Sequence, residues 1–238
     1  MSAASGWYQR PRRSIRISRA GTAVLARGSV VLLLAAMVLS ACGNDDDLRS
    51  RLRDMTLQDD DMPAEFKAEE GTFSSNEALA DDEAELQKLE GWDRLEGYEV
   101  TYRPETDPEL PFISVTSTIT IYGSEQGASE SLAEGIADAR KTDWEANHPG
   151  FGLLEVEEID RPDLADEILW LRISGHPSGD PANGVVADDL LVMREGPARA
   201  FVRVAIQDEE TPDRHAYLDD VEELAQAQLQ RIRDVLGL

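Results

Sequence analysis

The sequence predicts an α+β domain, in which an antiparallel sheet of about five to six strands carries helices mainly on one face. Apolar and polar residues alternate from residue 112 to residue 122, which is typical of a strand with one buried face. The tripeptide Glu195-Gly196-Pro197 separates two further alternating segments and indicates a tight hairpin. Apolar residues recur at helical spacing near the end of the chain, so a final helix is expected to cover the sheet.

Four helices are expected. The first is short, with Leu48, Leu52 and Met55 on one face, and the acidic run before Pro63 ends it. The other three begin at serine, asparagine or aspartate residues, whose side chains commonly cap helices. The expected helices span residues 48–55, 76–91, 124–147 and 213–236.

Six strands are expected, two before the third helix and four after it. Short links between them favour antiparallel pairing. A further extended piece lies at 66–73, between the first two helices. The expected strands span residues 95–102, 112–122, 153–159, 168–174, 185–194 and 199–207.

The chain begins with a basic segment that is followed by an apolar run. Six arginines and no acids precede residue 42, and the run from Ser29 to Leu39 is apolar. A basic segment, an apolar stretch of about 7–15 residues and small residues after it form a secretory signal. A transmembrane helix would need about 20 apolar residues. The sequence therefore predicts export, and the pair Arg12-Arg13 leaves the general secretory and twin-arginine routes open.

The apolar run ends in Leu39-Ser40-Ala41-Cys42, and Cys42 is the only cysteine of the chain. This tetrapeptide resembles the lipobox of bacterial lipoproteins, residue by residue. The resemblance implies cleavage before Cys42 and a diacylglyceryl group on its thiol, with a further acyl chain such as palmitate on the new amino terminus. Two acyl chains already give stable membrane attachment. The alternatives are a buried structural cysteine and a chance match at the end of an ordinary signal.

This interpretation divides the chain into three parts. Residues 1–41 are a signal peptide, 42–56 a lipid-anchored acidic tether with a short helix, and 57–238 a single globular domain. The expected location is the extracytoplasmic face of the cell membrane, and the membrane is a partner through the lipid on Cys42. Because no second cysteine exists, the domain depends on its core rather than on a disulfide.

The mature chain is strongly acidic. Without residues 1–41 it keeps 17 basic and 48 acidic residues, a formal net charge of −31. Nucleic acid is excluded as a partner because phosphate contacts require clustered Lys and Arg, and electrostatic docking on anionic lipid is disfavoured for the same reason. Three interpretations stay open: solubility and repulsion from the membrane, life in high salt, and an acidic patch that attracts cations or a basic partner.

The sequence contains no recognisable metal-binding, catalytic or phosphate-binding motif. The runs Asp45-Asp46-Asp47 and Asp59-Asp60-Asp61 lack the spacing and central glycine of a calcium loop. His148, His176 and His215 have no zinc-ligand spacing and are expected on the surface or at helix ends. No serine elbow or glycine-rich phosphate loop occurs, and Cys42 is committed to lipid. We expect no catalytic residue, metal or cofactor.

Trp170 is the residue at which a ligand face could be expected. It lies in a predicted strand, opposite in phase to Leu169 and Leu171. If helices cover only one face of the sheet, one of these two sets points outward. Trp170 and Ile168 would then line an open apolar face for an envelope protein or a small apolar ligand. Core packing is the alternative, and it is the commoner role of a tryptophan in a strand.

The C-terminal part carries a second resemblance. Leu164-Ala165-Asp166-Glu167 precedes a strand, Met193-Arg194-Glu195-Gly196 forms a hairpin end, and Arg231-Ile232 stands near the end of the last helix. From Pro162 onward this order is similar to small secreted sensor-type domains of Gram-positive bacteria, including lipoproteins and the extracellular parts of some Ser/Thr kinases. Ala165 stands where that pattern has glycine. The resemblance implies a non-enzymatic binding or sensing module on an α+β sheet.

The sequence as a whole favours a lipid-anchored binding or sensing domain outside the plasma membrane, without catalysis. An envelope hydrolase with an unrecognised carboxylate site is the first alternative, and an accessory subunit of an envelope complex is the second. A polar cleft with converging carboxylates would favour the hydrolase. An apolar groove or flat edge would favour binding, and a large exposed apolar patch would favour the accessory subunit.

Overall fold

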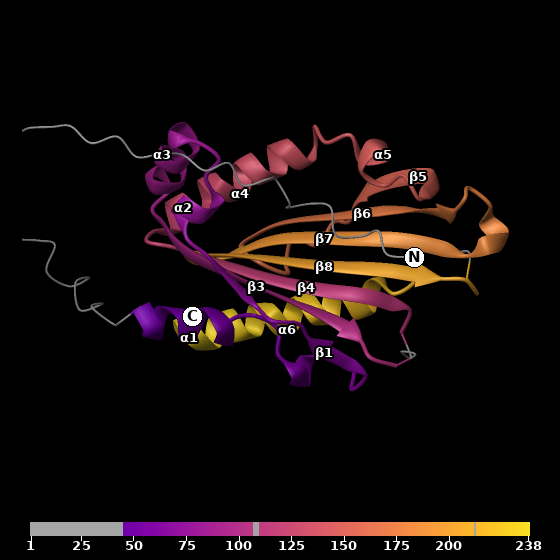
Figure 1. Ribbon diagram of the computed structural model, residues 1–238, viewed down its shortest axis with the longest axis horizontal. Coiled ribbons are helices and arrows are strands. Elements are labelled where there is room, and N and C mark those ends of the chain that lie inside the picture. The colour runs from indigo at the N-terminus through magenta and orange to yellow at the C-terminus, as the bar shows by residue number, and fades with distance from the viewer. Residues whose placement is uncertain (1–44, 107–109, 212) are drawn as a thin grey trace, which may run out of the picture. The chain divides into compact units, whose positions relative to one another are not determined.

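An eight-stranded antiparallel sheet organises the part of the chain that the computed structural model describes, residues 45–106, 110–211 and 213–238 (Figure 1). The α+β class and the antiparallel sheet are confirmed. The helices are α1 (Asp45–Asp54), α2 (Asn76–Leu79), α3 (Glu83–Gly91), α4 (Glu125–Ala139), α5 (Trp144–Asn147) and α6 (Leu218–Leu236), with short 3-10 turns η1 (Asp59–Asp61) and η2 (Pro181–Asn183). The strands are β1 (Phe66–Ala68), β2 (Thr72–Ser74), β3 (Arg94–Pro104), β4 (Phe112–Tyr122), β5 (Phe151–Glu158), β6 (Glu167–Pro177), β7 (Val185–Glu195) and β8 (Ala198–Asp208).

The expected number of five to six strands is wrong, because the segment at 66–73 forms two additional strands. The strands are ordered β1-β3-β4-β8-β7-β6-β5, and β2 also pairs with β3. β1 and β2 have three residues each, too few to show an alternating pattern. Their pairing depends on β3, which lies about 30 residues further along the chain.

The main hydrophobic core lies between one face of the sheet and the helices α1 and α6, which Figure 1 shows below the sheet. From Ala198 to Ile206, β8 alternates between buried and half-buried residues, and its buried set faces this core. The sheet residues at its centre include Val115, Ile119, Val202, Val204 and Leu191, and α6 adds Val221, Leu224, Ala225, Leu229 and Ile232.

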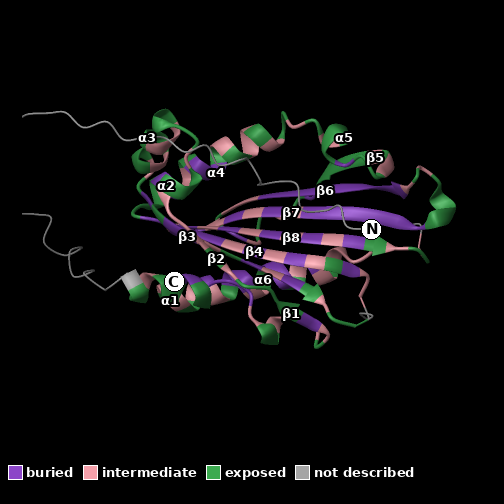
Figure 2. Ribbon diagram, in the orientation of Figure 1, coloured by how far each residue is buried: buried purple, intermediate pink, exposed green. Residues whose placement is uncertain are grey.

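Helices also cover part of the second face, so the expectation of helices mainly on one face is wrong. α4 and α5 lie above the sheet in Figure 1. There Leu169, Leu171 and Ile173 of β6 pack against Ile136 of α4 and Trp144 of α5. β6 and β7 are consequently buried on both faces (Figure 2). The periodicity of a helix shows which of its own faces is apolar but does not show which face of a sheet receives it.

Three of the expected helices differ in extent. The segment at 76–91 is broken at residues 80–82, where the side chain of Asp82 accepts a hydrogen bond from Glu85 N and starts α3. The third ends at Ala139, and Asp143 caps the short α5 in the same way. These aspartates restart the helix because their carboxylates satisfy backbone N–H groups that a helix start leaves unpaired. α6 begins at Leu218 rather than just after Asp213.

The boundary of the folded unit also differs from the expected one. One compact unit spans Gly43–Leu238, whereas the sequence suggested a tether to residue 56 and a domain from residue 57. The reason is α1, whose Leu52 is fully buried, as is Met55 just beyond it, both in the main core. Arg49 donates to both carboxylate oxygens of Glu96 on β3, at 2.8 to 3.3 Å. The short helix is therefore part of the domain.

We predict that Leu52→Ala lowers the free energy of unfolding by about 2–5 kcal/mol, because it removes buried methyl groups and leaves a cavity. Chemical denaturation of the Gly43–Leu238 unit measures this change. Arg51→Ala, in the same helix but exposed, is the control and should stay within about 0.5 kcal/mol of the wild type. Equal stability of the two variants would mean that α1 does not belong to the core.

Candidate functional site

A recess of about 420 Å³ lies between the end of α1, η1 and strand β3. We call it the α1 recess. Sites for small ligands commonly have volumes of about 300–1,000 Å³ and combine an apolar floor with a few placed polar groups. The α1 recess has this composition, with Val100 and the rings of two tyrosines beside charged side chains. It is lined by Arg53, Thr56, Leu57, Gln58, Asp59, Asp60, Ala68, Glu69, Tyr98, Val100 and Tyr102.

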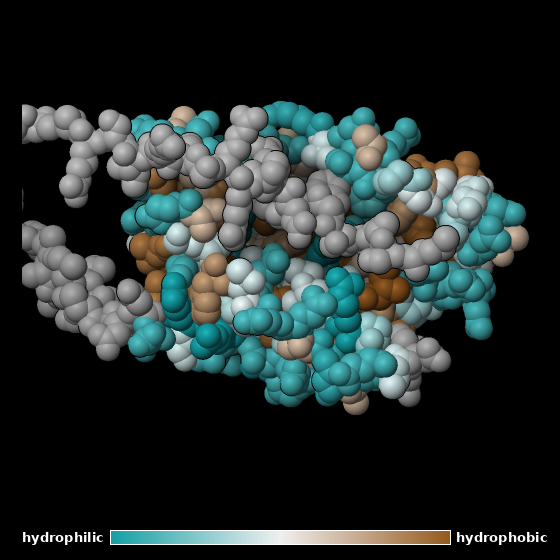
Figure 3. All heavy atoms as spheres, in the orientation of Figure 1, coloured by the Kyte–Doolittle hydropathy of each residue, from teal (hydrophilic) through white to brown (hydrophobic). Residues whose placement is uncertain are grey.

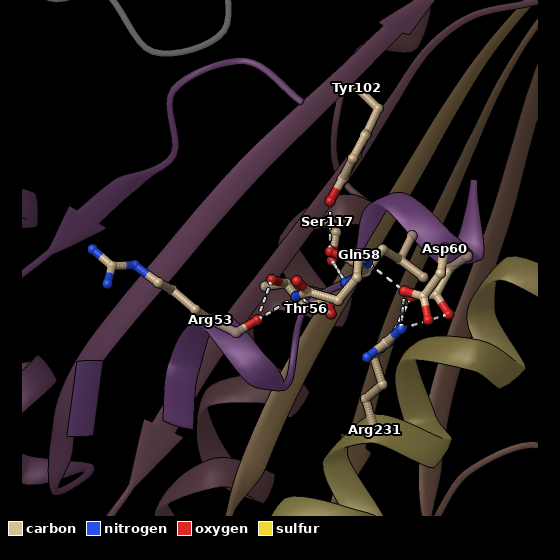
Figure 4. A network of polar contacts seen from close by, with 9 residues as sticks. Arg53, Thr56, Gln58, Asp60, Tyr102, Ser117 and Arg231 are labelled. Carbon is tan, nitrogen blue, oxygen red and sulfur yellow. Dashed lines mark hydrogen bonds and ion pairs between the residues drawn. The ribbon is translucent and has the colours of Figure 1, made fainter. Parts of the chain in front are cut away.

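A network of hydrogen bonds fixes the wall of this recess to the sheet (Figure 4). Leu57 is fully buried, and both its backbone polar groups find side-chain partners on the sheet. Its N–H donates to Ser117 Oγ on β4 at 3.0 Å, and its carbonyl accepts from the Tyr102 hydroxyl on β3 at 2.7 Å. Burial, with Asp59 and Asp61 nearby, raises the pKa of Tyr102 to about 12. The hydroxyl therefore keeps its proton and stays a donor at any ordinary pH.

The same network reaches α6. The backbone N–H of Gln58 donates to Asp61 Oδ2 at 2.8 Å. Arg231 of α6 donates to Asp60 Oδ1 at 2.6 Å and to both carboxylate oxygens of Asp61. Two of the three consecutive aspartates at 59–61 are thus bound by an arginine from a distant helix. These contacts hold η1 between the sheet and α6.

Arg53 stands at the edge of the α1 recess, and its guanidinium stacks on aromatic rings. Its central carbon lies 4.9 Å from the ring centre of Phe73 and 6.0 Å from that of Tyr98. The two rings are themselves 4.6 Å apart. Within residues 45–106, 110–211 and 213–238, neither Arg53 nor Asp59 has a side chain that makes a hydrogen bond or an ion pair. This sets Arg53 apart, because most arginines among the described residues are paired with acids.

A second recess, of about 640 Å³, lies between the β5–β6 connection and α6. Its charged groups are largely committed to one another. Arg161 Nε donates to Glu222 at 2.8 Å, and Arg233 Nε donates to Glu195 at 2.7 Å. The α1 recess is the better candidate because it offers one cation and one anion whose side chains have no hydrogen-bond or ion-pair partner in the described part of the chain.

Trp170 is a core residue rather than part of an open apolar face. Its side chain is 1% exposed and lies in the main core, with Ile168 partly buried against the same core. Its indole N–H donates to Asp189 Oδ1 at 2.8 Å. The open ligand face expected at Trp170 and Ile168 does not exist, because Trp170 is buried in the main core, to which α6 also contributes.

Asp189, which accepts the hydrogen bond of Trp170, also belongs to a buried ion pair that the sequence pattern does not predict. Arg172 and Asp189 are at most 1% exposed, with Arg172 Nη1 3.1 Å from Asp189 Oδ2. Arg172 Nη2 donates to the carbonyl of Ala216, in the loop before α6. Arg172 Nε and Nη1 and Asp189 Oδ2 make no well-aligned hydrogen bond. Burial raises the pKa of Asp189 to about 6, against the opposing effects of Arg172 and of the Trp170 hydrogen bond.

Two of the three histidines are buried rather than on the surface, and one of them, His148, is at the helix end that the sequence predicts as the alternative, since it is the C-cap of α5. His148 Nε2 lies 3.2 Å from Asp188 Oδ2, and Asp188 also accepts from Arg203 at 2.6 to 3.0 Å. His176 Nδ1 lies 2.6 Å from the carbonyl of Gly184. His215 is exposed, as expected. In the described part of the chain, no three acidic, histidine or cysteine side chains converge as metal ligands would.

The lipobox residues Leu39, Ser40, Ala41 and Cys42 lie outside the described residues. Their role stays a prediction from the sequence. Among the residues that are described, no helix has the length and apolar character needed to cross a bilayer.

Comparisons with known proteins leave the family open. No protein-family model and no curated protein matches the chain. The extracellular domain of PknH from Mycobacterium tuberculosis is a solved structure that aligns with 79% of this chain and 96% of its own length, at 10% identity and a TM-score of 0.47. A likeness at this level establishes neither a shared fold nor a shared function. The resemblance of the part from Pro162 onward to sensor-type domains stays a prediction.

The Tyr102 hydroxyl should contribute measurably to stability. Tyr102→Phe leaves the buried Leu57 carbonyl without its donor, which we expect to lower the free energy of unfolding by about 1–3 kcal/mol. Tyr98→Phe is the matched control on the same strand, because the Tyr98 hydroxyl makes no hydrogen bond to the described residues. Denaturant unfolding compares the two. If Tyr98→Phe were as destabilising as Tyr102→Phe, the hydrogen bond would not be the cause.

Asp189 should make stability depend on pH in a particular direction. Its pKa rises from 3.8 to about 6 on folding, so the folded state binds the proton more tightly. The stabilisation that this tighter proton binding gives the folded state is therefore fully present below about pH 4 and is lost as the pH rises to about 6. Compared with the Asp189→Asn variant, the wild type should show a falling free energy of unfolding as the pH rises through this window. Above the window, the difference between the two proteins should stay constant. A constant difference from pH 4 to pH 7 would contradict the shifted pKa.

Proposed function

We propose that the protein is a lipid-anchored, extracytoplasmic binding domain that performs no catalysis. The observation that carries this proposal is the position of the lipobox relative to α1. Cys42 stands three residues before Asp45, where a helix begins that is packed into the core. Three residues span at most about 11 Å. A lipid on Cys42 would therefore keep the α1 end of the domain close to the membrane surface.

The acidic surface suits such a position. Hydrophilic residues predominate on the described surface in Figure 3. With a net charge of −31 in the mature chain, the domain would be repelled by anionic headgroups and would stay folded beside the bilayer rather than adsorb to it. The acyl chains would then supply the attachment without help from the protein surface.

The α1 recess favours binding over hydrolysis. Hydrolysis of glycosidic bonds by carboxyl groups typically uses two of them that flank one bond. Of the acids lining the recess, Asp60 is bound by Arg231, and Glu69 accepts from Arg103 at 2.9 Å. Among the described residues that line the recess, Asp59 is the one acid without such a partner, which gives no support to a hydrolase with a pair of free carboxyl groups there. The most exposed large apolar side chains are spread over α2, β3, β4, β5 and the C-terminus, which gives no support to an accessory subunit with one apolar docking face.

The anchor is tested by expressing the full chain and Cys42→Ala in a bacterium and measuring intact mass and membrane fractionation. We expect the wild type to lose residues 1–41, gain acyl mass and sit in the membrane fraction. The variant should gain no acyl mass and leave the membrane fraction or keep its signal peptide. A wild type that is secreted without lipid would overturn the proposal.

A further inference from the structure

We propose that the α1 recess binds a short peptide with both termini free, of about two or three residues. This inference rests on the proposed binding function and deepens it by naming the class of ligand. It follows from four features of the recess: an arginine and an aspartate whose side chains have no partner among the described residues, an apolar floor, and a size that suits a small molecule.

Arg53 is prepared to receive a carboxylate. Its guanidinium lies over the rings of Phe73 and Tyr98, so the face of the group is occupied by aromatic contacts. The N–H groups point out of the edge of the guanidinium plane, and none of them donates to a protein acceptor among the described residues. A stacked guanidinium with free edges is the arrangement in which arginine binds a carboxylate through two parallel hydrogen bonds.

Asp59 supplies the opposite charge. Arg53 belongs to the last turn of α1 and Asp59 to η1, so the two charges come from different elements of the lining. The remaining charges of the lining, Asp60 and Glu69, are neutralised by arginines. The recess therefore presents one cation and one anion that have no hydrogen-bond or ion-pair partner among the described residues. A ligand that satisfies both carries a carboxylate and an ammonium, as a short peptide does.

The floor and the volume limit what lies between those two charges. Val100 is buried and Tyr98 half-buried, and both line the recess. Small apolar side chains match this floor, and a volume of about 420 Å³ is at the lower end for ligand sites. An extended peptide of three residues is about 10 Å long. A ligand with no net charge also escapes the repulsion that this acidic chain exerts on anions.

Titration calorimetry on the Gly43–Leu238 unit, which has its own core, tests the proposal with three probes. They are trialanine, its C-terminal amide and its N-acetyl derivative. We expect trialanine to bind at least tenfold more tightly than either blocked form, because each blocked form loses one charge-assisted contact. If trialanine does not bind, or if a blocked form binds equally well, the proposal is overturned.

Variants assign each terminus to its residue. Arg53→Ala should remove the preference for trialanine over its amide, and Asp59→Asn should remove the preference over the acetylated form. Arg51→Ala and Asp54→Asn are matched controls on α1, exposed and outside the recess, and should bind as the wild type does. Circular dichroism confirms that all four variants are folded. Equal loss in variants and controls would overturn the assignment.

The two proposals fail separately. Calorimetry uses a chain without Cys42, so its outcome does not depend on lipid attachment. The mass and fractionation of the full chain do not depend on the recess. Absence of peptide binding in a protein that is lipidated would overturn the ligand class and leave the anchor in place.

Discussion

An isolated helix of ten residues is marginal in water, so α1 depends on what it packs against. Leu52 and Met55 place its apolar side in the main core, and the segment after it is bound to the sheet through Leu57. The α1 recess exists only because of this packing, since one of its walls is the end of α1 and the turn that follows. Loss of the packing would remove the wall and would also lengthen the connection to Cys42.

Two adjacent aspartates on β7 constrain the register of that strand. Side chains of neighbouring strand residues point to opposite faces. Asp188 binds Arg203 on one face and Asp189 lies against Arg172 on the other. A slip of β7 by one residue would move each aspartate to the wrong face and leave buried charges without partners. Such pairs add little to stability compared with apolar residues, but they disfavour the wrong register.

The sequence predicted those parts of the fold that depend on local pattern. The six long strands are predictable because β-branched and apolar residues alternate or continue in them. For Trp170, the sequence also gives core packing as the commoner of two roles, and the structure has it in the core. The number of strands and the placement of helices on both faces were not visible, because β1, β2 and α4 are positioned by partners far away in the sequence. Asp82 and Asp143 restart helices within patterns that looked continuous. The capping role of an aspartate depends on backbone geometry that its identity alone does not reveal.

The candidate site was missed for a related reason. Arg53, Asp59 and Tyr98 come from α1, η1 and β3, and no spacing in the sequence links them. A local signal did exist, because an amphipathic turn before Pro63 suggests a helix with a buried face. The sequence places this helix in a tether, because the residues from Gly43 to Asp47 that precede it are polar and acidic. The packing of Leu52 and Met55 reverses that assignment.

The proposed anchor and the proposed ligand place limits on each other. α1 rises about 1.5 Å per residue, so its ten residues are about 15 Å long. Added to the short connection from Cys42, this would place the α1 recess within about 25 Å of the headgroups if Cys42 is lipidated as proposed. A short peptide is small enough to reach a recess at that distance from a bilayer, so the proposed ligand is compatible with the proposed anchor.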